Sequence, residues 1–385
     1  MKKLILLYWG TVLLMYLSQQ IFYKDAVPRS LGEHTGEKHF LKVKSDILVC
    51  MVILWMTCFS FLRTAYNDTG AYIDAFNKAK PVAEGFINGA YSNWLANPLS
   101  ILYRDVMRSL TSNYHLYFLI PAFLNTAAFV KLFDRYSISP AFSVLIFISV
   151  GTYVTYLASL KQSIAMFFLL ASVPYALDKK YFKFAALVAI ATLFHTYAIV
   201  FGFIPLLMGK PWGKSTWILL GIMVFTMATY DQTFGALIEY VESYGAEMHA
   251  DEIFYDAKLN ILRILVYWVP GIIALIFNKQ LFNSTSKVNC LFCNLSMVAA
   301  MFLTLGLVKG GNLMARMSAY FEFGTCITLP WMIEKLFAKR SAKTVFMIAI
   351  VMYFGYFFYE FAMNKNFDYN YSAISLWEFI KNLLG

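Results

Sequence analysis

The chain has 385 residues, of which 60% are hydrophobic and only 14% are charged. Soluble proteins carry about 25% charged residues, so this composition excludes a soluble globular protein and indicates a polytopic membrane protein. The net charge of +10 does not indicate nucleic-acid binding, because the Lys and Arg residues lie in short loops between apolar runs. We therefore expect an all-α fold that forms a single polytopic membrane domain over residues 1–385.

Apolar runs that could cross a bilayer recur along the whole chain, since a spanning helix needs about 20 apolar residues. The first run, at 4–22, has parts of a signal peptide but lacks a small-residue cleavage site, so we expect it to span. The other candidates lie at 46–62, 114–131, 140–158, 162–177, 182–208, 216–230, 262–277, 289–308, 313–332 and 344–361. These runs predict about ten to twelve membrane-embedded segments.

The distribution of basic residues predicts the orientation of these spans. The loops that we expect in the cytoplasm hold 18 of the 32 Lys and Arg residues, whereas Lys2 and Lys3 violate the scheme by facing outward. For its two flanking loops to share a side, the run 182–208 must form two half-helices that meet near His195. Such broken helices need protein or a water-filled cavity around their exposed backbone groups. A single tilted helix, which would invert all later spans, is the alternative.

Two segments on the expected outer side are too polar to span. Within an external loop at 63–112, apolar residues recur at helical spacing, which predicts an amphipathic helix that lies in the membrane interface. The residues of this apolar face are Leu95, Leu99, Leu102, Val106 and Leu110. The second segment, 231–261, is predicted to be an external acidic loop.

A dense polar cluster directly follows the run 46–62. The stretch FLRTAYNDTGAYIDAF places Arg63, Asp68, Thr69 and Tyr72 at the membrane surface. We interpret it as the mouth of a membrane-embedded active site, and an ordinary juxtamembrane loop is the alternative. Arg63 suits a diphosphate, because a guanidinium binds phosphate through two parallel hydrogen bonds, although it could instead reach the lipid headgroups. Asp68 suits a carboxylate that accepts a proton from a hydroxyl, although its position is also typical of a helix cap.

Further polar residues lie at membrane depth, where ionisable groups usually face a cavity or a partner. Lys161 and Gln162 open a span at a point where orientation requires no cation, so a diphosphate contact is a candidate role. Arg316, like Arg63, could bind a diphosphate or instead reach the lipid headgroups. His195 lies between the two predicted half-helices. Its candidate role is proton transfer or a hydrogen bond to a sugar, and a purely structural role is the alternative.

Motifs for other chemistry are missing from the sequence. It contains no Walker loop, no GxSxG, no HExxH and no DxD, which argues against nucleotide-driven transport and zinc hydrolysis. The five cysteines lie in or beside apolar runs, and the CxxC of Cys290 and Cys293 has neither a second pair nor a nearby histidine. We therefore expect no metal and no cofactor.

The order of these segments resembles the EpsG family of bacterial exopolysaccharide polymerases, relatives of the Wzy O-antigen and capsule polymerases. The resemblance covers about residues 45–335. It rests on Arg63 with the following DTGAYIDAF, then on KQSIAMFFLLAS, KKYFKFAALVAIATLFHTYAIV and RMSAYFEFGTCITLP. Two positions depart from the family pattern. Lys161 stands where the family usually has Arg before Gln, and Thr69 stands where it often has Tyr after Asp68.

The resemblance implies a glycosyltransferase on the outer face of the bacterial inner membrane. It would move a growing glycan from one undecaprenyl diphosphate onto the next lipid-linked repeat unit, and O-antigen, capsule and exopolysaccharide remain open as products. The expected partners are the lipid-linked donor and acceptor and the bilayer, with a chain-length regulator and a flippase as further candidates, and no nucleic acid. Two other functions are the alternatives: a flippase for lipid-linked oligosaccharide, or a glycan ligase.

Our hypothesis for the site divides the candidate residues by role. Basic groups hold the donor diphosphate and stabilise charge on the leaving group, while a base activates or orients the acceptor hydroxyl. The residues are Arg63, Lys161 and Arg316 for the diphosphate, Asp68 or His195 for the hydroxyl, and Thr69, Tyr72 and Gln162 for substrate sugar.

Overall fold

The computed structural model describes residues 6–7, 9–11, 13, 47–243, 253–254, 258–283, 285–363 and 371–384. Most of these residues are helical, and the strands among them are two short ones that pair with each other. The predicted all-α class is therefore confirmed. Most of the expected first span, including Lys2 and Lys3, lies outside the described residues.

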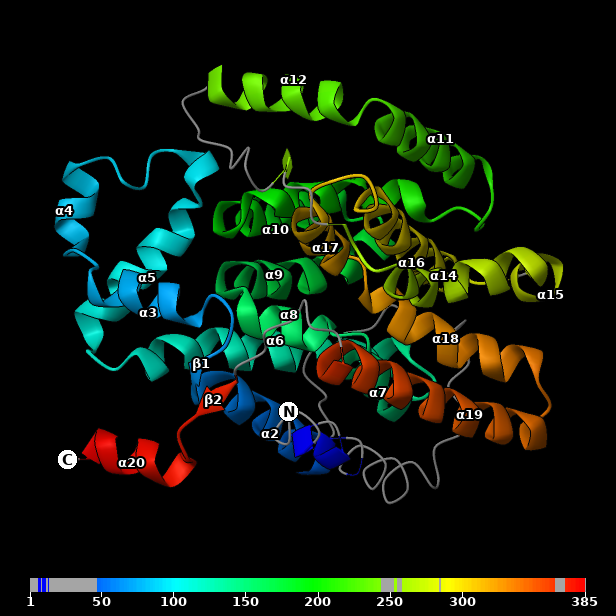
Figure 1. Cartoon of the computed structure of the whole chain (residues 1–385), viewed down its shortest axis with the longest axis horizontal. Helices are drawn as coiled ribbons and strands as arrows, with labels where there is room; N and C mark the ends of the chain where they lie inside the picture. Colours follow the sequence, from blue (N-terminus) through cyan, green and yellow to red (C-terminus); the bar gives the residue numbers. More distant parts are fainter. Residues whose placement is uncertain are drawn as a thin grey trace. The chain divides into compact units, whose positions relative to one another are not determined.

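The helices follow the predicted apolar runs closely. The earlier elements are α2 (Ile47–Phe61), β1 (Arg63–Ala65), α3 (Thr69–Asn77), α4 (Val82–Ile87), η1 (Trp94–Ala96), α5 (Pro98–Leu110), α6 (Tyr114–Tyr136), α7 (Pro140–Ser149), α8 (Thr152–Ala158), α9 (Leu160–Leu177), α10 (Tyr181–Phe194) and the 3₁₀ helix η2 (Thr196–Leu207). The later elements are α11 (Lys214–Ala228), α12 (Tyr230–Ser243), α14 (Ile261–Ile276), α15 (Asn278–Phe282), α16 (Lys287–Leu305), α17 (Gly311–Ala319), α18 (Phe323–Leu336), α19 (Lys339–Phe358), the π-helix η3 (Tyr359–Met363), β2 (Ser372–Ala373) and α20 (Leu376–Leu384) (Figure 1).

Several of these helices meet the requirements of a membrane span. Among the described residues, α6, α9, α16 and the stretch Arg340–Phe361 are long and apolar enough to cross, and α7 with α8 adds a fifth span if the bent pair is counted as one. Shorter apolar helices occupy other predicted runs, among them α10, α11 and α14. The protein is therefore a multi-pass membrane protein, while the count of ten to twelve segments stays a prediction.

Predicted runs are interrupted at three points. α7 and α8 meet at an angle of 58° beside Gly151, whose φ of +87° favours a residue without a side chain. The run 313–332 is divided into α17 and α18, with the fully buried carboxyl group of Glu322 at the junction. At His195 the α-helix α10 gives way to the 3₁₀ helix η2, whereas the strongly bent pair among the described helices is α7 with α8. That residues 182–208 enter and leave the membrane on the same side stays a prediction.

The chain divides into two compact units, which we describe separately. The first comprises Met1–Val173, Phe182–Ile199 and Phe346–Gly385. In it α2 packs along α6, and α3 and α5 pack against α6 as well. Phe61, Phe76, Tyr117, Phe118, Leu160 and Phe379 belong to one buried hydrophobic cluster, which we call the Phe118 cluster. This cluster brings the end of α2, the start of α6 and the start of α9 together, and every candidate site residue except Arg316 lies in this unit.

The second unit comprises Pro174–Tyr181 and Val200–Val345. Its central helix is α16, which packs against α11, α14, α17 and α18. Gly324 allows α18 to approach α16 closely, because a Cβ atom at this position would lie 2.5 Å from the backbone oxygen of Phe292 and 2.6 Å from the backbone nitrogen of Ser296. Small residues at such crossings let membrane helices pack backbone to backbone.

Gly324→Ala should therefore destabilise the second unit. The added methyl group meets backbone atoms that cannot rotate away, and overpacking of this kind costs about 1–3 kcal/mol or more. Thermal unfolding of the detergent-purified protein measures the effect. Gly221→Ala in α11 is the matched control, because a Cβ there meets nothing within 4 Å. A melting temperature for Gly324→Ala equal to that of the control would contradict the close packing.

Candidate active site

Arg63 is the residue at which the apolar helix α2 gives way to the strand β1. Its side chain is only 1% exposed, and its guanidinium carbon lies 4.2 Å from the centroid of the Phe118 ring. Nε donates a hydrogen bond to Oγ1 of Thr69 at 3.1 Å, and Nη1 donates to the backbone oxygen and the hydroxyl of Ser60. No described residue accepts a hydrogen bond from Nη2. Two of the three guanidinium nitrogens thus hold the group in one orientation.

The positive charge of Arg63 has no carboxylate partner in the part of the chain that the structure describes. Burial lowers the pKa of Arg63 to about 10, which still leaves the group protonated at neutral pH. The acceptors around it are neutral oxygens and an aromatic ring, so they orient the charge without neutralising it. A buried cation that no described carboxylate compensates attracts an anion, and phosphate oxygens match the geometry of a guanidinium. Because the side chain is buried, the alternative in which Arg63 reaches the lipid headgroups does not fit.

The start of α3 holds Arg63 from the other side. Thr69 is fully buried, and its hydroxyl donates to the backbone oxygen of Tyr66 at 2.5 Å while it accepts from Arg63. Asp68 occupies the N-cap position of α3, as its neighbours predict, but its side chain makes no capping hydrogen bond. Helix capping therefore does not account for the half-exposed carboxylate of Asp68. Tyr72, one turn further along α3, packs against the Phe118 cluster.

A strand from a distant part of the sequence pairs with the strand that carries Arg63. β2 pairs antiparallel with β1, with Ala373 opposite Arg63. The hydroxyl of Tyr371 donates to the backbone oxygen of Phe59 at 2.6 Å, and the two rings stack at 5.4 Å. Sequence reasoning missed this contact, because a strand of two residues carries no periodic pattern. The pairing fixes the backbone on which the guanidinium is mounted.

Lys161 and Gln162 lie in the first turn of α9. The preceding residue, Leu160, belongs to the Phe118 cluster, so the start of α9 and Arg63 contact the same buried cluster. Gln162 is fully buried, whereas Lys161 is half-buried. The side chain of Asn125 in α6 donates to the backbone oxygen of Ser163 at 3.0 Å, which fixes the start of α9 against α6.

His195 lies in a different part of the first unit. Its chain neighbours bond to the segment around η1 and α5: the backbone nitrogen of Thr196 donates to Oδ1 of Asn97 at 2.8 Å, and the hydroxyl of Ser100 donates to the backbone oxygen of Phe194 at 2.6 Å. These contacts hold the break at His195 against that segment. Arg316 is a partly exposed residue of α17 in the second unit.

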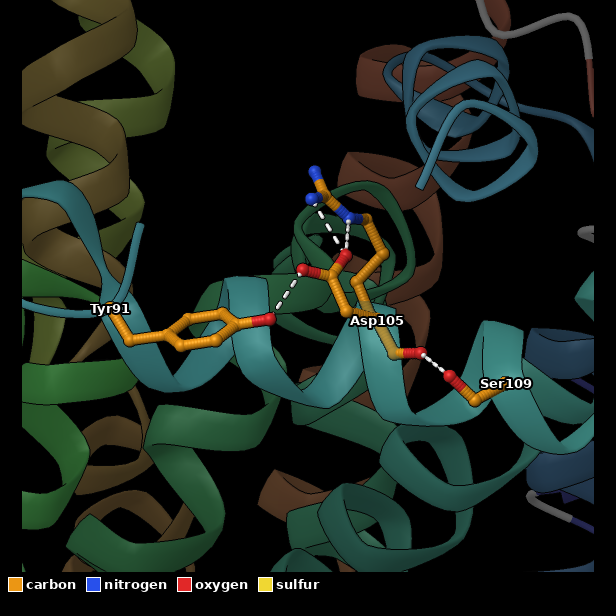
Figure 2. Close-up of polar contacts among 4 residues, drawn as sticks. Tyr91, Asp105 and Ser109 are labelled. Atoms are coloured by element: carbon orange, nitrogen blue, oxygen red, sulfur yellow. Dashed lines mark hydrogen bonds and ion pairs between the residues drawn. The ribbon is translucent and has the colours of Figure 1, made fainter. Parts of the chain in front are cut away.

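The predicted amphipathic helix is present as α5, with Val106 and Leu110 exposed on its apolar face. The unexpected residue is Asp105, which is buried and accepts hydrogen bonds from Tyr91 at 2.9 Å and from Nε of Arg104 at 2.8 Å (Figure 2). Burial raises the pKa of the Tyr91 hydroxyl, so it remains a donor. The only sequence signal for this network is an acidic residue beside an arginine, which is too common to be specific.

A comparison with family models now adds to this geometry. The model of the EpsG family matches residues 46–373. The chain belongs to the EpsG family. No curated protein and no solved structure matched it. The matched range contains α2 and both strands around Arg63. Membership of the EpsG family supports, in broad terms, a Wzy-like polysaccharide polymerase and a role in polysaccharide biosynthesis at a membrane.

Thr69→Val should destabilise this EpsG-family protein by about 1–3 kcal/mol, because it leaves a buried charged donor of Arg63 without its acceptor. Thermal unfolding in detergent measures the change. Thr192→Val is the matched control: the hydroxyl of Thr192 is also buried but donates only to the backbone oxygen of Val188 in its own helix, at 2.9 Å. Equal melting temperatures for the two variants would show that Thr69 does not hold the guanidinium.

Proposed function

We propose that this protein is a membrane glycosyltransferase that polymerises oligosaccharide repeat units carried on undecaprenyl diphosphate. It acts in the bacterial inner membrane with its site facing outward, and its product is O-antigen, capsule or exopolysaccharide. The observation that carries the proposal is the buried guanidinium of Arg63, which has no carboxylate partner among the described residues and lies within the range that matches the EpsG family.

The proposed reaction transfers a glycan between two lipids. A hydroxyl of the acceptor repeat unit attacks the anomeric carbon of the donor glycan, the bond from that carbon to the diphosphate breaks, and undecaprenyl diphosphate leaves. Arg63 binds the diphosphate and stabilises the negative charge that develops on it. Lys161 is proposed as a further phosphate ligand, and Tyr72 and Gln162 as sugar contacts. Arg316 belongs to the second unit and stays a candidate from the sequence alone. The two hydrogen bonds of Thr69 support a role in positioning Arg63.

The acceptor hydroxyl must lose a proton during transfer, and Asp68 and His195 are the two candidates to receive it. What supports Asp68 is its place in the chain. The next residue, Thr69, is bonded directly to Arg63, and the Asp68 carboxylate is not used as a helix cap. The neighbours of His195 bond instead to the segment around η1 and α5. We therefore assign the proton to Asp68 and a positioning role to His195.

The first test is complementation of a deletion strain with wild type, Arg63→Ala and Arg63→Lys at matched protein levels. We expect Arg63→Ala to lower polymer formation at least about 100-fold, as removal of one charge-stabilising donor does elsewhere, and Arg63→Lys to restore part of it. The readout is the glycan ladder. Arg135→Ala is the matched control, because Arg135 also lies over an aromatic ring, at 5.2 Å from that of Tyr136, but is exposed at the other end of α6.

The same gels separate the proposed function from its alternatives. A deletion strain that accumulates a single lipid-linked repeat unit on the outer face supports a polymerase. If no repeat unit reaches the outer face, the protein is a transporter and the proposal is wrong. A normal ladder in the deletion strain would exclude polymerase and transporter alike.

Asp68→Asn and His195→Gln test the assignment of the base. Loss of a general base lowers turnover by about 10²–10⁴-fold, so we expect Asp68→Asn to fall in that range and His195→Gln to fall by less than about tenfold. Turnover of purified enzyme on a lipid-linked repeat unit, measured across pH, provides the comparison. A larger loss for His195→Gln, together with loss of the acidic limb of the pH profile, would transfer the role to His195.

A further inference from the structure

A surface pocket of about 520 Å³ lies in the first unit, away from Arg63. It opens between the α3–α4 linker, Ala79–Pro81, and the end of α5 with the linker that follows it, Arg108–Ser112. Its volume falls within the range of about 300–1,000 Å³ that small-molecule sites occupy. Nothing in the proposed transfer reaction uses these residues.

The cations near this pocket differ in their partners. Arg104 is bound to the buried carboxylate of Asp105 by Nε at 2.8 Å and by Nη2 at 2.7 Å (Figure 2). Lys80 in the pocket wall is paired with Glu84. Arg108, one turn along α5 from Arg104, forms no ion pair and no hydrogen bond with any residue in the described part of the chain. The pocket therefore contains one guanidinium whose donors are available to an anion.

The rest of the lining is suited to a sugar. The pocket lining includes three residues with hydroxyl groups, which are Ser109, Thr111 and Ser112. The hydroxyl of Ser109 donates to the backbone oxygen of Asp105, while that of Thr111 accepts from the backbone nitrogen of Asn113 and keeps its own proton to donate. Leu110 adds an apolar surface that is 76% exposed. Hydroxyl donors beside an apolar patch match the polar edge and the apolar face of a sugar ring.

The number of Lys and Arg residues in the pocket favours a ligand with a single anionic group over an anionic membrane surface. Segments that bind anionic lipid headgroups carry about 4–8 Lys and Arg residues. This pocket has two, and Glu84 is paired with one of them. One unpaired guanidinium matches one oxyanion.

A continuous layer of aromatic side chains joins this pocket to Arg63. The guanidinium carbon of Arg108 lies 5.5 Å from the centroid of the Phe76 ring, Phe76 stacks on Tyr117 at 5.0 Å, and Tyr117 contacts Phe118 at 5.5 Å. Phe118 in turn lies beneath Arg63. The two cations are thus connected through one chain of contacting aromatic rings, so a ligand that contacts both would be held in a defined orientation.

We propose that this pocket binds an acidic sugar of the repeat unit, with the sugar carboxylate on Arg108 and the sugar hydroxyls on Thr111 and Ser112. The proposal rests on the proposed function in that the sugar belongs to the lipid-linked substrate. It adds a substrate class, because a repeat unit that contains a uronic acid would be bound at both its diphosphate and its carboxylate.

Direct binding tests the proposal without turnover. The full-length protein is placed in phosphatidylcholine nanodiscs and titrated with methyl glucuronide or methyl glucoside, and binding is followed by saturation-transfer NMR. We expect the glucuronide to bind at least about tenfold more tightly, because only it carries the carboxylate. Arg108→Gln should remove this preference, Arg108→Lys should retain part of it, and the exposed control Arg135→Gln should leave it unchanged.

The possible outcomes separate the sources of the anion. Equal binding of the two sugars, or an unchanged preference in Arg108→Gln, overturns the proposal. In a further arm, phosphatidylglycerol replaces phosphatidylcholine and inorganic phosphate is added as a competitor. If both changes abolish glucuronide binding, the pocket binds a lipid headgroup phosphate, which also overturns the proposal. No step of this assay requires polymerisation. The sugar-binding proposal can therefore be wrong while the glycan ladder still depends on Arg63, and sugar binding can be confirmed while the ladder does not depend on Arg63.

Discussion

The central constraint on this structure is the burial of one positive charge at the end of an apolar helix. Transfer of a guanidinium out of water is unfavourable unless its donors find acceptors. Here Ser60 and Thr69 supply oxygens, and Phe118 supplies the negative face of a ring. All of these partners are neutral, so they hold the group in place and preserve its charge. The surrounding helices, the turn into α3 and the pairing of β1 all serve to maintain that arrangement.

Two arginines in the first unit show how a counter-ion decides what a guanidinium does. Arg104 is bound to the buried carboxylate of Asp105, and this carboxylate also accepts the hydrogen bond of Tyr91 that ties its segment to α5. Arg63 is more deeply buried and lacks such a partner among the described residues. The first arginine therefore stabilises the scaffold, and the second is available to attract an anion. For the proposed transfer of a glycan from a diphosphate, this difference matters more than the net charge of the chain.

The sequence predicted the helices well, because long apolar runs and their flanking loops report directly on span boundaries. The break at His195 was also predictable, since a run of that length is too long for one span and too short for two. The bend at Gly151 and the division before α18 were not, because hydropathy is continuous through both. The site was only partly predictable: Arg63 and Thr69 stand out locally, whereas Phe118 and the strand β2 approach them from distant parts of the chain. The burial of Asp105 was not predictable either, because its partner Tyr91 belongs to a separate segment of the external loop.

The pairing of β1 with β2 has a consequence for how the molecule assembles. The hydroxyl groups of Thr64 and Ser372 bond at 2.6 Å across a separation of 308 residues. During synthesis α2 and Arg63 enter the membrane early, yet the strand opposite them is translated only after the intervening helices. Contacts with such large sequence separation form late, because the ends of a long segment must first come together. The nascent protein therefore lacks the strand opposite Arg63 until the segment that carries β2 docks, so a copy truncated before β2 would lack the pairing that supports this residue.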